Sequence, residues 1–232
     1  MTRLGATPGR RRLPRFARRA AALSAAVVLT VVLAQSATSA AFTAQTVDTG
    51  NQVSSAASFC LSPGTKPPLY PSEDTASYES STTTNYGTNV QFGVLSAAGG
   101  NVRGFVRFPL PNISGCTITG ATLRLYVASP APGRLIDVYR VDPAAPLWTE
   151  LGLTWSNQPG TTGTAVTTSS LTGAGWQEWT VTDLVTAMKS GVNNGFLVRD
   201  GADGSSPPKS NYYDSKESAT PANKPQLVLT WG

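Results

Sequence analysis

Arginines and aromatic residues recur at every second position in two segments near the middle of the chain. Arg103, Phe105 and Arg107 follow this spacing, and Arg124 and Tyr126 repeat it in the next segment. Alternate residues of a β-strand point to the same face. Guanidinium groups bind carboxylates through paired hydrogen bonds, and aromatic rings pack on the apolar faces of sugars. If the two strands are neighbours, these side chains form one surface for a polysaccharide that contains uronic acids.

Two cations near the C-terminal end, Arg199 and Lys216, could extend or border that surface, although the sequence does not assign their faces. Trp176 and Trp179 fall on opposite faces of one strand, so at least one of them lies outside the core. Trp155 suits either packing or a sugar platform. For all of these side chains a structural role is the alternative, because outward arginines and aromatic rings also form ordinary cross-strand pairs.

Four acidic residues are candidate ligands for a calcium ion. Glu73 and Asp74 stand at the start of the strand-rich region, and Asp200 and Asp203 flank the Gly-rich turn RDGADGSS. Calcium binds carboxylate and carbonyl oxygens on loops, which suits both places. The turn lacks the acid spacing and the terminal glutamate of an EF-hand, so a solvated turn is the alternative.

The chain contains no histidine, which removes much catalytic chemistry. Ser-His-Asp and Cys-His nucleophiles, His-ligated zinc or haem, and histidine pH switches are excluded. G-x-S-x-G, Walker-loop and paired-cysteine metal motifs are absent as well. A carboxylate pair such as Glu150 with Glu178 would suit a glycosidase, but nothing singles it out among 13 acidic residues. We therefore expect a protein that is not an enzyme.

The net charge of +5 is concentrated at the N-terminus. Residues 1–41 contain seven of the 18 basic residues and no acidic one, which leaves 11 basic against 13 acidic residues downstream. The rest of the chain is slightly acidic, which argues against a nucleic-acid partner. Within residues 1–41, a basic start, an apolar run over 20–34 and the small residues that follow are typical of a secretory signal peptide.

The apolar run is shorter than a membrane span requires, so we expect cleavage near Ala40 or Ala41 and a protein that is secreted or at the cell surface. An uncleaved anchor is the alternative, and membrane contact is expected only through it. In an exported protein, Cys60 and Cys116 favour a disulfide, with two unpaired thiols as the alternative. Residues 42–69 are small, polar and rich in turn formers, which indicates a linker or N-terminal segment.

From about residue 70 to the end, short strands alternate with turn signals. Apolar and polar residues alternate cleanly over 102–110 and 121–127, which predicts half-buried antiparallel strands. Residues 182–191 predict one short helix with Thr182 as its N-cap. We expect an all-β fold, an antiparallel β-sandwich of the jelly-roll type with one short helix. Further strands are predicted over residues 136–141, 152–155, 175–181, 195–200, 211–217 and 226–232.

The ordered motifs of residues 70–232 resemble a DNRLRE domain. Among them are EDTASYESSTTTNYGTNVQFG, VRGFVRFPL, ITGATLRLYVAS, WTELGLTWSNQP and GWQEWTVTDLVTAMKSG, in this order and at fitting intervals. Part of that group is classed as carbohydrate-binding module family 96. The resemblance implies an extracellular β-sandwich that binds glycans, with acidic polysaccharides such as alginate as the best-known ligands and calcium often present.

No catalytic domain is apparent beside this module, which puts in doubt a role in targeting an enzyme to its substrate. We expect a secreted, non-catalytic carbohydrate-binding module for cell-wall or acidic polysaccharides, with polysaccharide as its partner. The alternative is a structural protein of the cell surface or extracellular matrix without a glycan ligand. The sequence does not indicate an oligomeric state.

Overall fold

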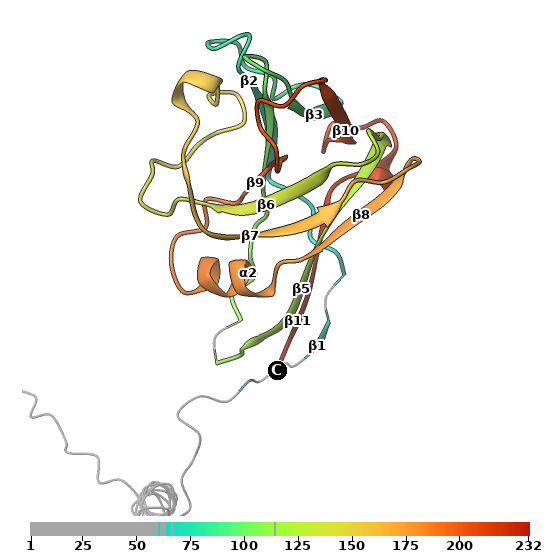
Figure 1. Cartoon of the computed structure of the whole chain (residues 1–232). Coiled ribbons are helices and arrows are strands. Elements are labelled where there is room, and N and C mark those ends of the chain that lie inside the picture. The colour runs from blue at the N-terminus through green and yellow to red at the C-terminus, as the bar shows by residue number, and fades with distance from the viewer. Residues whose placement is uncertain (1–59, 61–63, 66, 114) are drawn as a thin grey trace, which may run out of the picture. The chain divides into compact units, whose positions relative to one another are not determined.

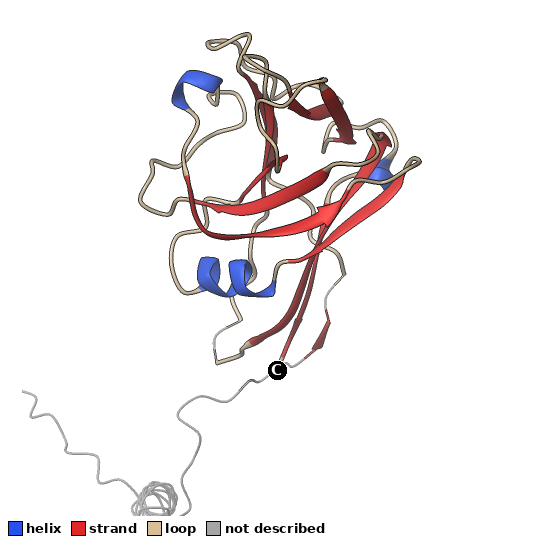
Figure 2. Cartoon of the chain, in the orientation of Figure 1, coloured by secondary structure: helices blue, strands red, loops and turns tan. Residues whose placement is uncertain are grey.

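The computed structural model describes residue 60, residues 64–65, residues 67–113 and residues 115–232. Antiparallel strands dominate this region (Figure 1), and its helices are short (Figure 2). The predicted all-β, sandwich-like fold is confirmed, whereas the jelly-roll connectivity stays a prediction. The predicted leader, 1–41, and most of the predicted linker, 42–69, lie outside the described residues. Within the described part of the chain, no helix combines the length and apolar character that crossing a membrane requires.

The first layer of the sandwich carries the Arg103 segment. In order, it contains β2 (Glu73–Tyr78), β4 (Val102–Arg107), β9 (Phe196–Asp200), β6 (Leu135–Val141) and β7 (Thr161–Ser169). All of these neighbours pair antiparallel, with β4 between β2 and β9. The polar strand β7 was not among the predicted strands.

The second layer carries the Arg124 segment. It contains β3 (Gln91–Ser96), β10 (Lys209–Asp214), β5 (Ile118–Ser129), β8 (Gly175–Thr180), β11 (Gln226–Trp231) and the short β1 (Gly64–Thr65). The long strand β5 pairs with β8 along one edge, and with β11 and then β10 along the other. β3 pairs with β10 and meets β4 at Leu95 and Val102, so the two layers are parts of one curled sheet.

Apolar residues of both layers meet in a shared core. Val106 on β4, and Leu123 and Leu125 on β5, are fully buried, as their alternation predicts. A hydrogen bond also crosses this core, because the buried indole Nε1 of Trp179 donates to the carbonyl oxygen of Ile136 at 3.0 Å. Apolar burial therefore holds the layers together, and the indole joins β8 to β6.

Residues 142–160, which we call the covering segment, lie over the outer face of the first layer between β6 and β7. The segment includes the short 3-10 helix η1 (Trp155–Asn157). Its Trp148 and Leu153 pack against Phe105 of β4 and Leu197 of β9 in a second, small core. The strand predicted over 152–155 is therefore wrong: those apolar residues are buried by a loop that crosses the sheet, not by strand pairing.

The described residues contain one α-helix, α2 (Thr182–Lys189), which lies within the predicted range 182–191 and ends two residues earlier, because Ser190 is its C-cap. The prediction of Thr182 as N-cap is wrong, because Val181 takes that position. The hydroxyl oxygen of Thr182 instead accepts a hydrogen bond from the backbone N–H of Ala121 at 3.1 Å, which attaches the helix to β5. The buried residues of the helix are Leu184, Val185 and Met188.

The predicted disulfide between Cys60 and Cys116 is confirmed. A few residues after Cys60, Gly64 of β1 pairs with Trp231 of β11. The covalent bond and this strand pairing fix the start of the described chain to the second layer.

Replacing Cys60 and Cys116 by serine is expected to lower the free energy of unfolding. In the chain-entropy model, a crosslink between residues 56 apart contributes at most about 4 kcal/mol. Urea unfolding of the oxidised protein, the reduced protein and the double variant measures the loss. Equal stability of the oxidised and reduced wild type would contradict the prediction, and the double variant, insensitive to reductant, is the control.

Candidate functional site

Arg103 lies on the outer face of β4, as its alternation predicts. Its guanidinium packs on the ring of Trp155, with Cζ 4.6 Å from the ring centroid. Its Nη2 also donates to Oδ2 of Asp203 at 2.7 Å. Asp203, a predicted calcium ligand, thus serves as the ion-pair partner of a predicted glycan residue, and the charge of Arg103 is compensated.

Phe105 does not face solvent, although it is on the same face of β4. Its side chain is 0% exposed, because the covering segment lies over it. The Trp148 ring meets it edge-on at 5.8 Å between centroids. The prediction that Phe105 offers its ring to a sugar is therefore wrong.

Arg107 forms an ion pair with Glu73, which stands opposite it on β2. Its guanidinium also lies 5.6 Å from the ring centroid of Trp148. The second carboxylate oxygen of Glu73 accepts a hydrogen bond from the backbone N–H of Glu150 at 2.8 Å. Arg107 and Glu73 therefore fasten the covering segment to β2.

Arg124 and Tyr126 lie on the outer face of the second layer, on β5. Because β4 and β5 are not neighbours, the five alternating residues do not form the single surface that neighbouring strands would give. Arg124 pairs with Glu178 at 2.6 Å and lies 4.5 Å from the ring centroid of Trp176. Trp179 points into the core while Trp176 is partly exposed, which confirms their predicted opposite faces.

Arg199 lies on β9 opposite Asp137 of β6, and the Tyr139 hydroxyl links the two, because it donates to Oδ2 of Asp137 at 3.4 Å. Within the described part of the chain Arg199 forms no ion pair. Its Cζ lies 4.6 Å from the ring centroid of Tyr139, and its Nη2 donates to the Tyr139 hydroxyl at 2.9 Å. The pairing of Gly104 with Val198 sets Arg199 beside Arg103 on the same outer face. We call these two residues with Trp155 and Tyr139 the arginine face.

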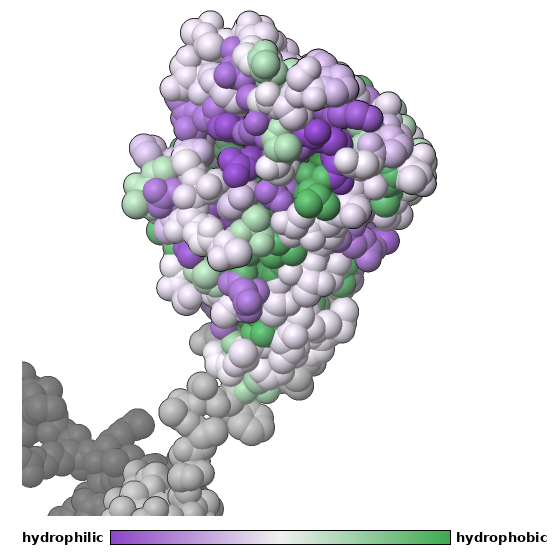
Figure 3. Space-filling view, in the orientation of Figure 1, coloured by the Kyte–Doolittle hydropathy of each residue, from purple (hydrophilic) through white to green (hydrophobic). Residues whose placement is uncertain are grey.

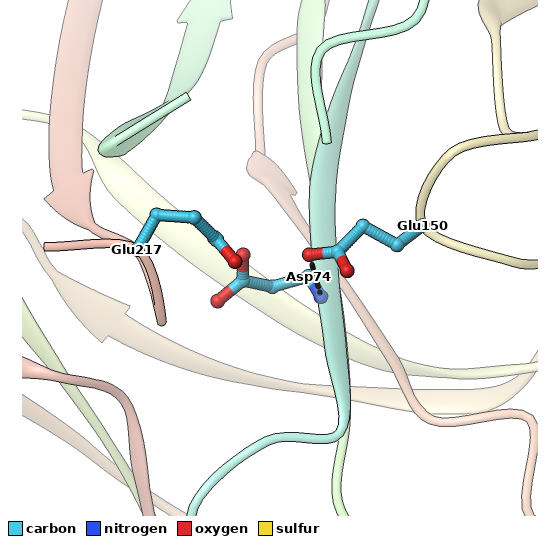
Figure 4. A group of neighbouring side chains, drawn as sticks. All are labelled: Asp74, Glu150 and Glu217. Carbon is cyan, nitrogen blue, oxygen red and sulfur yellow. Dashed lines mark hydrogen bonds between the residues drawn. The ribbon is translucent and has the colours of Figure 1, made fainter. Parts of the chain in front are cut away.

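Three carboxylates converge beside β2, and only one of them belongs to the predicted calcium ligands. One oxygen from each of Asp74, Glu150 and Glu217 lies within 4.8 Å of the others. Figure 4 shows Asp74 between the two glutamates, which come from the covering segment and from the loop after β10. This cluster could hold a metal ion, since calcium prefers such oxygen ligands.

Lys216 supplies a cation inside this acidic cluster. Its Nζ lies 2.9 Å from Oε2 of Glu150 and also pairs with Glu217. Its backbone N–H donates to Oδ2 of Asp74 at 2.7 Å. Although burial works against its charge, hydrogen bonds to Glu217 and Glu150 raise the pKa of Lys216. Lys216 is therefore a member of an internal ion network rather than of the arginine face.

Burial raises the pKa of Asp74 to about 8, and the neighbouring Glu217 and Glu150 carboxylates act in the same direction. The hydrogen bond from the Lys216 backbone opposes this increase. Asp74 itself is only 1% exposed. Burial and the two neighbouring carboxylates therefore favour the protonated form of Asp74, which reduces the repulsion within the cluster.

Asp200, another predicted calcium ligand, forms an ion pair with Arg134. It is fully buried, and its two oxygens accept hydrogen bonds from Nε and Nη2 of Arg134 at 2.7 and 2.6 Å. Three of the four predicted calcium ligands, Glu73, Asp200 and Asp203, therefore form separate ion pairs with arginines. Only Asp74 belongs to the acidic cluster. Nothing in the local sequence marks Glu150 and Glu217, because they join Asp74 only through the fold.

Asn85 and Gly87 position Glu150 from a loop between β2 and β3. The Asn85 Nδ2 donates to the carbonyl oxygens of Glu150 and Leu153 at 2.6 and 2.8 Å. A Cβ on Gly87 would lie 2.4 Å from the Glu150 carbonyl oxygen, so only glycine allows this approach.

In Figure 3, hydrophilic residues gather across the upper part of the domain, the part to which β2 and β10 belong in Figure 1.

A family model described as carbohydrate-binding module family 96 matches residues 65–231, which is more than half of the chain. The chain belongs to carbohydrate-binding module family 96. No curated protein matches the chain. Membership in family 96 confirms the resemblance noted from the sequence and indicates a carbohydrate, specifically a polysaccharide, as the partner. A family 96 module binds rather than cleaves, which agrees with the expectation of a protein that is not an enzyme.

Replacing Lys216 by methionine is expected to destabilise this family 96 module by roughly 2 kcal/mol. The change leaves Glu150 and Glu217 without their cation, and the partial exposure of Lys216 reduces the cost below that of a fully buried pair. Urea unfolding at neutral pH measures the loss. Lys224→Met is the matched control, because Lys224 forms no ion pair among the described residues. Equal losses in the two variants would contradict the assignment.

Proposed function

We propose that the protein is a secreted, non-catalytic module that binds polysaccharides containing uronic acids. The observation that carries the proposal is the family 96 match over residues 65–231. Secretion is supported by the signal-like residues 1–41 and by the disulfide, which belongs to an oxidising compartment. Cleavage of the leader and release from the cell would place the module outside, where such polysaccharides occur.

The arginine face is the proposed site for the uronate carboxylate. Arg199 makes no direct ion pair within the described residues and reaches Asp137 only through the Tyr139 hydroxyl, whereas Arg103 already pairs with Asp203. A sugar carboxylate at Arg199 would make charge-assisted hydrogen bonds, which are stronger than those between neutral groups. The partly exposed Trp155 beside Arg103 offers a ring to the apolar face of an adjacent sugar.

Binding to uronate polymers is expected to depend on Arg199. In affinity electrophoresis, gels containing alginate or pectate should retard the wild type, and gels with a neutral glucan or no polymer serve as references. Arg199→Gln is expected to weaken the retardation roughly tenfold or more, because a charge-assisted contact is lost. The control is Arg140→Gln, which removes another partly exposed arginine without an ion pair among the described residues.

Unchanged retardation of Arg199→Gln would contradict the proposed site. Migration without retardation in every gel would contradict glycan binding and favour the alternative, a structural protein of the cell surface or extracellular matrix.

We further propose that calcium and Lys216 compete for the acidic cluster. The three carboxylates suit calcium, but the ammonium of Lys216 already lies among them and would repel the ion. Calcium is therefore expected to raise the melting temperature of Lys216→Met more than that of the wild type. Thermal unfolding of both proteins in calcium and in EDTA tests this, and an equal response, or none in the variant, would contradict the competition.

A further inference from the structure

A groove of about 410 Å³ lies on the outer face of the second layer, on strands that do not contribute to the arginine face. It spans β5, β10 and β3 and the loop that leads from β10 to β11. Neither the proposed uronate site nor the acidic cluster uses these residues. The lining residues on which the argument depends are Val90, Gln91, Tyr126, Ala128, Asp214 and Asn223.

Tyr126 gives the groove a rigid aromatic wall. It stands opposite Trp176 of β8, and the two rings meet edge to face with centroids 5.6 Å apart. The guanidinium of Arg124 also packs on the Trp176 ring, with Cζ 4.5 Å from its centroid, and pairs with Glu178. A ring fixed in this way loses little side-chain freedom when a sugar packs on it, so the cost of binding is low.

Two side-chain amides in the groove are held in place with part of their hydrogen-bonding capacity unused. Asp214 is only 7% exposed, and its two oxygens accept hydrogen bonds from Nε2 of Gln91 and Nδ2 of Asn223, both at 2.9 Å. The amide oxygens of Gln91 and Asn223 have no hydrogen-bond partner within the described part of the chain. Fixed amides of this kind can accept from and donate to sugar hydroxyls.

The charged residue that lines the groove indicates whether acidic or neutral sugars can bind there. Asp214 is the single charged residue among those that line it, and it is an acid. A uronate carboxylate would be repelled there, whereas hydroxyl groups suit the amides. We infer that this groove is a second glycan site, which binds pyranose units of a neutral polysaccharide. The inference rests on the proposed carbohydrate-binding function and adds to it a ligand class that the arginine face does not serve.

Aromatic rings continue from the groove along β10. Tyr212 precedes Asp214 by two residues, which sets it on the same face, and it is 39% exposed. It stands opposite Gly93, where a Cβ would lie only 3.4 Å from both the Tyr212 ring and the Tyr78 hydroxyl. Tyr78 in turn lies 4.1 Å from Tyr86 between ring centroids. A ligand longer than one sugar would therefore meet Tyr212 after Tyr126.

Affinity electrophoresis of the full secreted protein in gels cast with hydroxyethylcellulose, arabinoxylan, galactomannan or alginate tests the inference. At least one neutral polymer is expected to retard the wild type. Tyr126→Ala should weaken that retardation about tenfold or more while leaving alginate retardation unchanged, and Tyr126→Phe, which keeps the ring, should behave as wild type. Tyr212→Ala, a change at an exposed ring, should weaken it several-fold and provides the test if Tyr126→Ala fails to fold.

Absence of retardation by all three neutral polymers would overturn the inference, as would neutral-polymer binding that neither tyrosine variant weakens. Loss of neutral and alginate binding together in Tyr126→Ala, with folding intact, would also overturn it, because it would indicate one common site. Retardation by a neutral polymer but not by alginate would support this groove and contradict the uronate preference proposed above. The two proposals can therefore fail separately.

Discussion

Partly buried carboxylates beside β2 each meet a cation or a hydrogen-bond donor, and this requirement organises the first layer. Glu73 meets Arg107, while Glu150 and Glu217 meet Lys216. Leaving these acids charged and unpaired would destabilise the fold, so the ion pairs fix the segments that carry them. They join β2 to the covering segment and to the loop after β10. Arg107 and Lys216, which suit a glycan by their chemistry, are consequently used inside the protein.

The covering segment then determines which side chains a ligand can reach. It removes Phe105 from the surface and leaves Arg199, which contacts Tyr139, beside the Arg103–Trp155 pair. The second layer has no comparable cover over Tyr126, which lines an open groove. The two outer faces therefore differ in charge: one carries the guanidinium groups of Arg103 and Arg199, and the other carries aromatic rings and amides around a single acid.

Strand positions could be predicted where apolar and polar residues alternate cleanly, as Leu123 and Leu125 of β5 illustrate, whereas β2 and β3 were not among the predicted strands. The sequence did not predict the Thr-rich strand β7, because neither of its faces is buried and no apolar alternation marks it. Phe105 was assigned to the correct face of its strand but to the wrong environment, because periodicity does not reveal that a loop covers that face. Thr182 has the chemistry of an N-cap, yet a tertiary contact with Ala121 uses its hydroxyl.

The candidate site was predicted in residue type better than in arrangement. Ion pairs between distant segments, such as Arg103 with Asp203, leave no local pattern, so predicted glycan and metal residues turned out to be partners.

The central proposal, that Arg199 of this family 96 module binds a uronate carboxylate, is tested most directly by titration calorimetry with an alginate hexasaccharide at two salt concentrations. The account predicts binding whose affinity falls as sodium chloride rises from about 50 mM to about 500 mM. No binding at either concentration, or an affinity independent of salt, would contradict it.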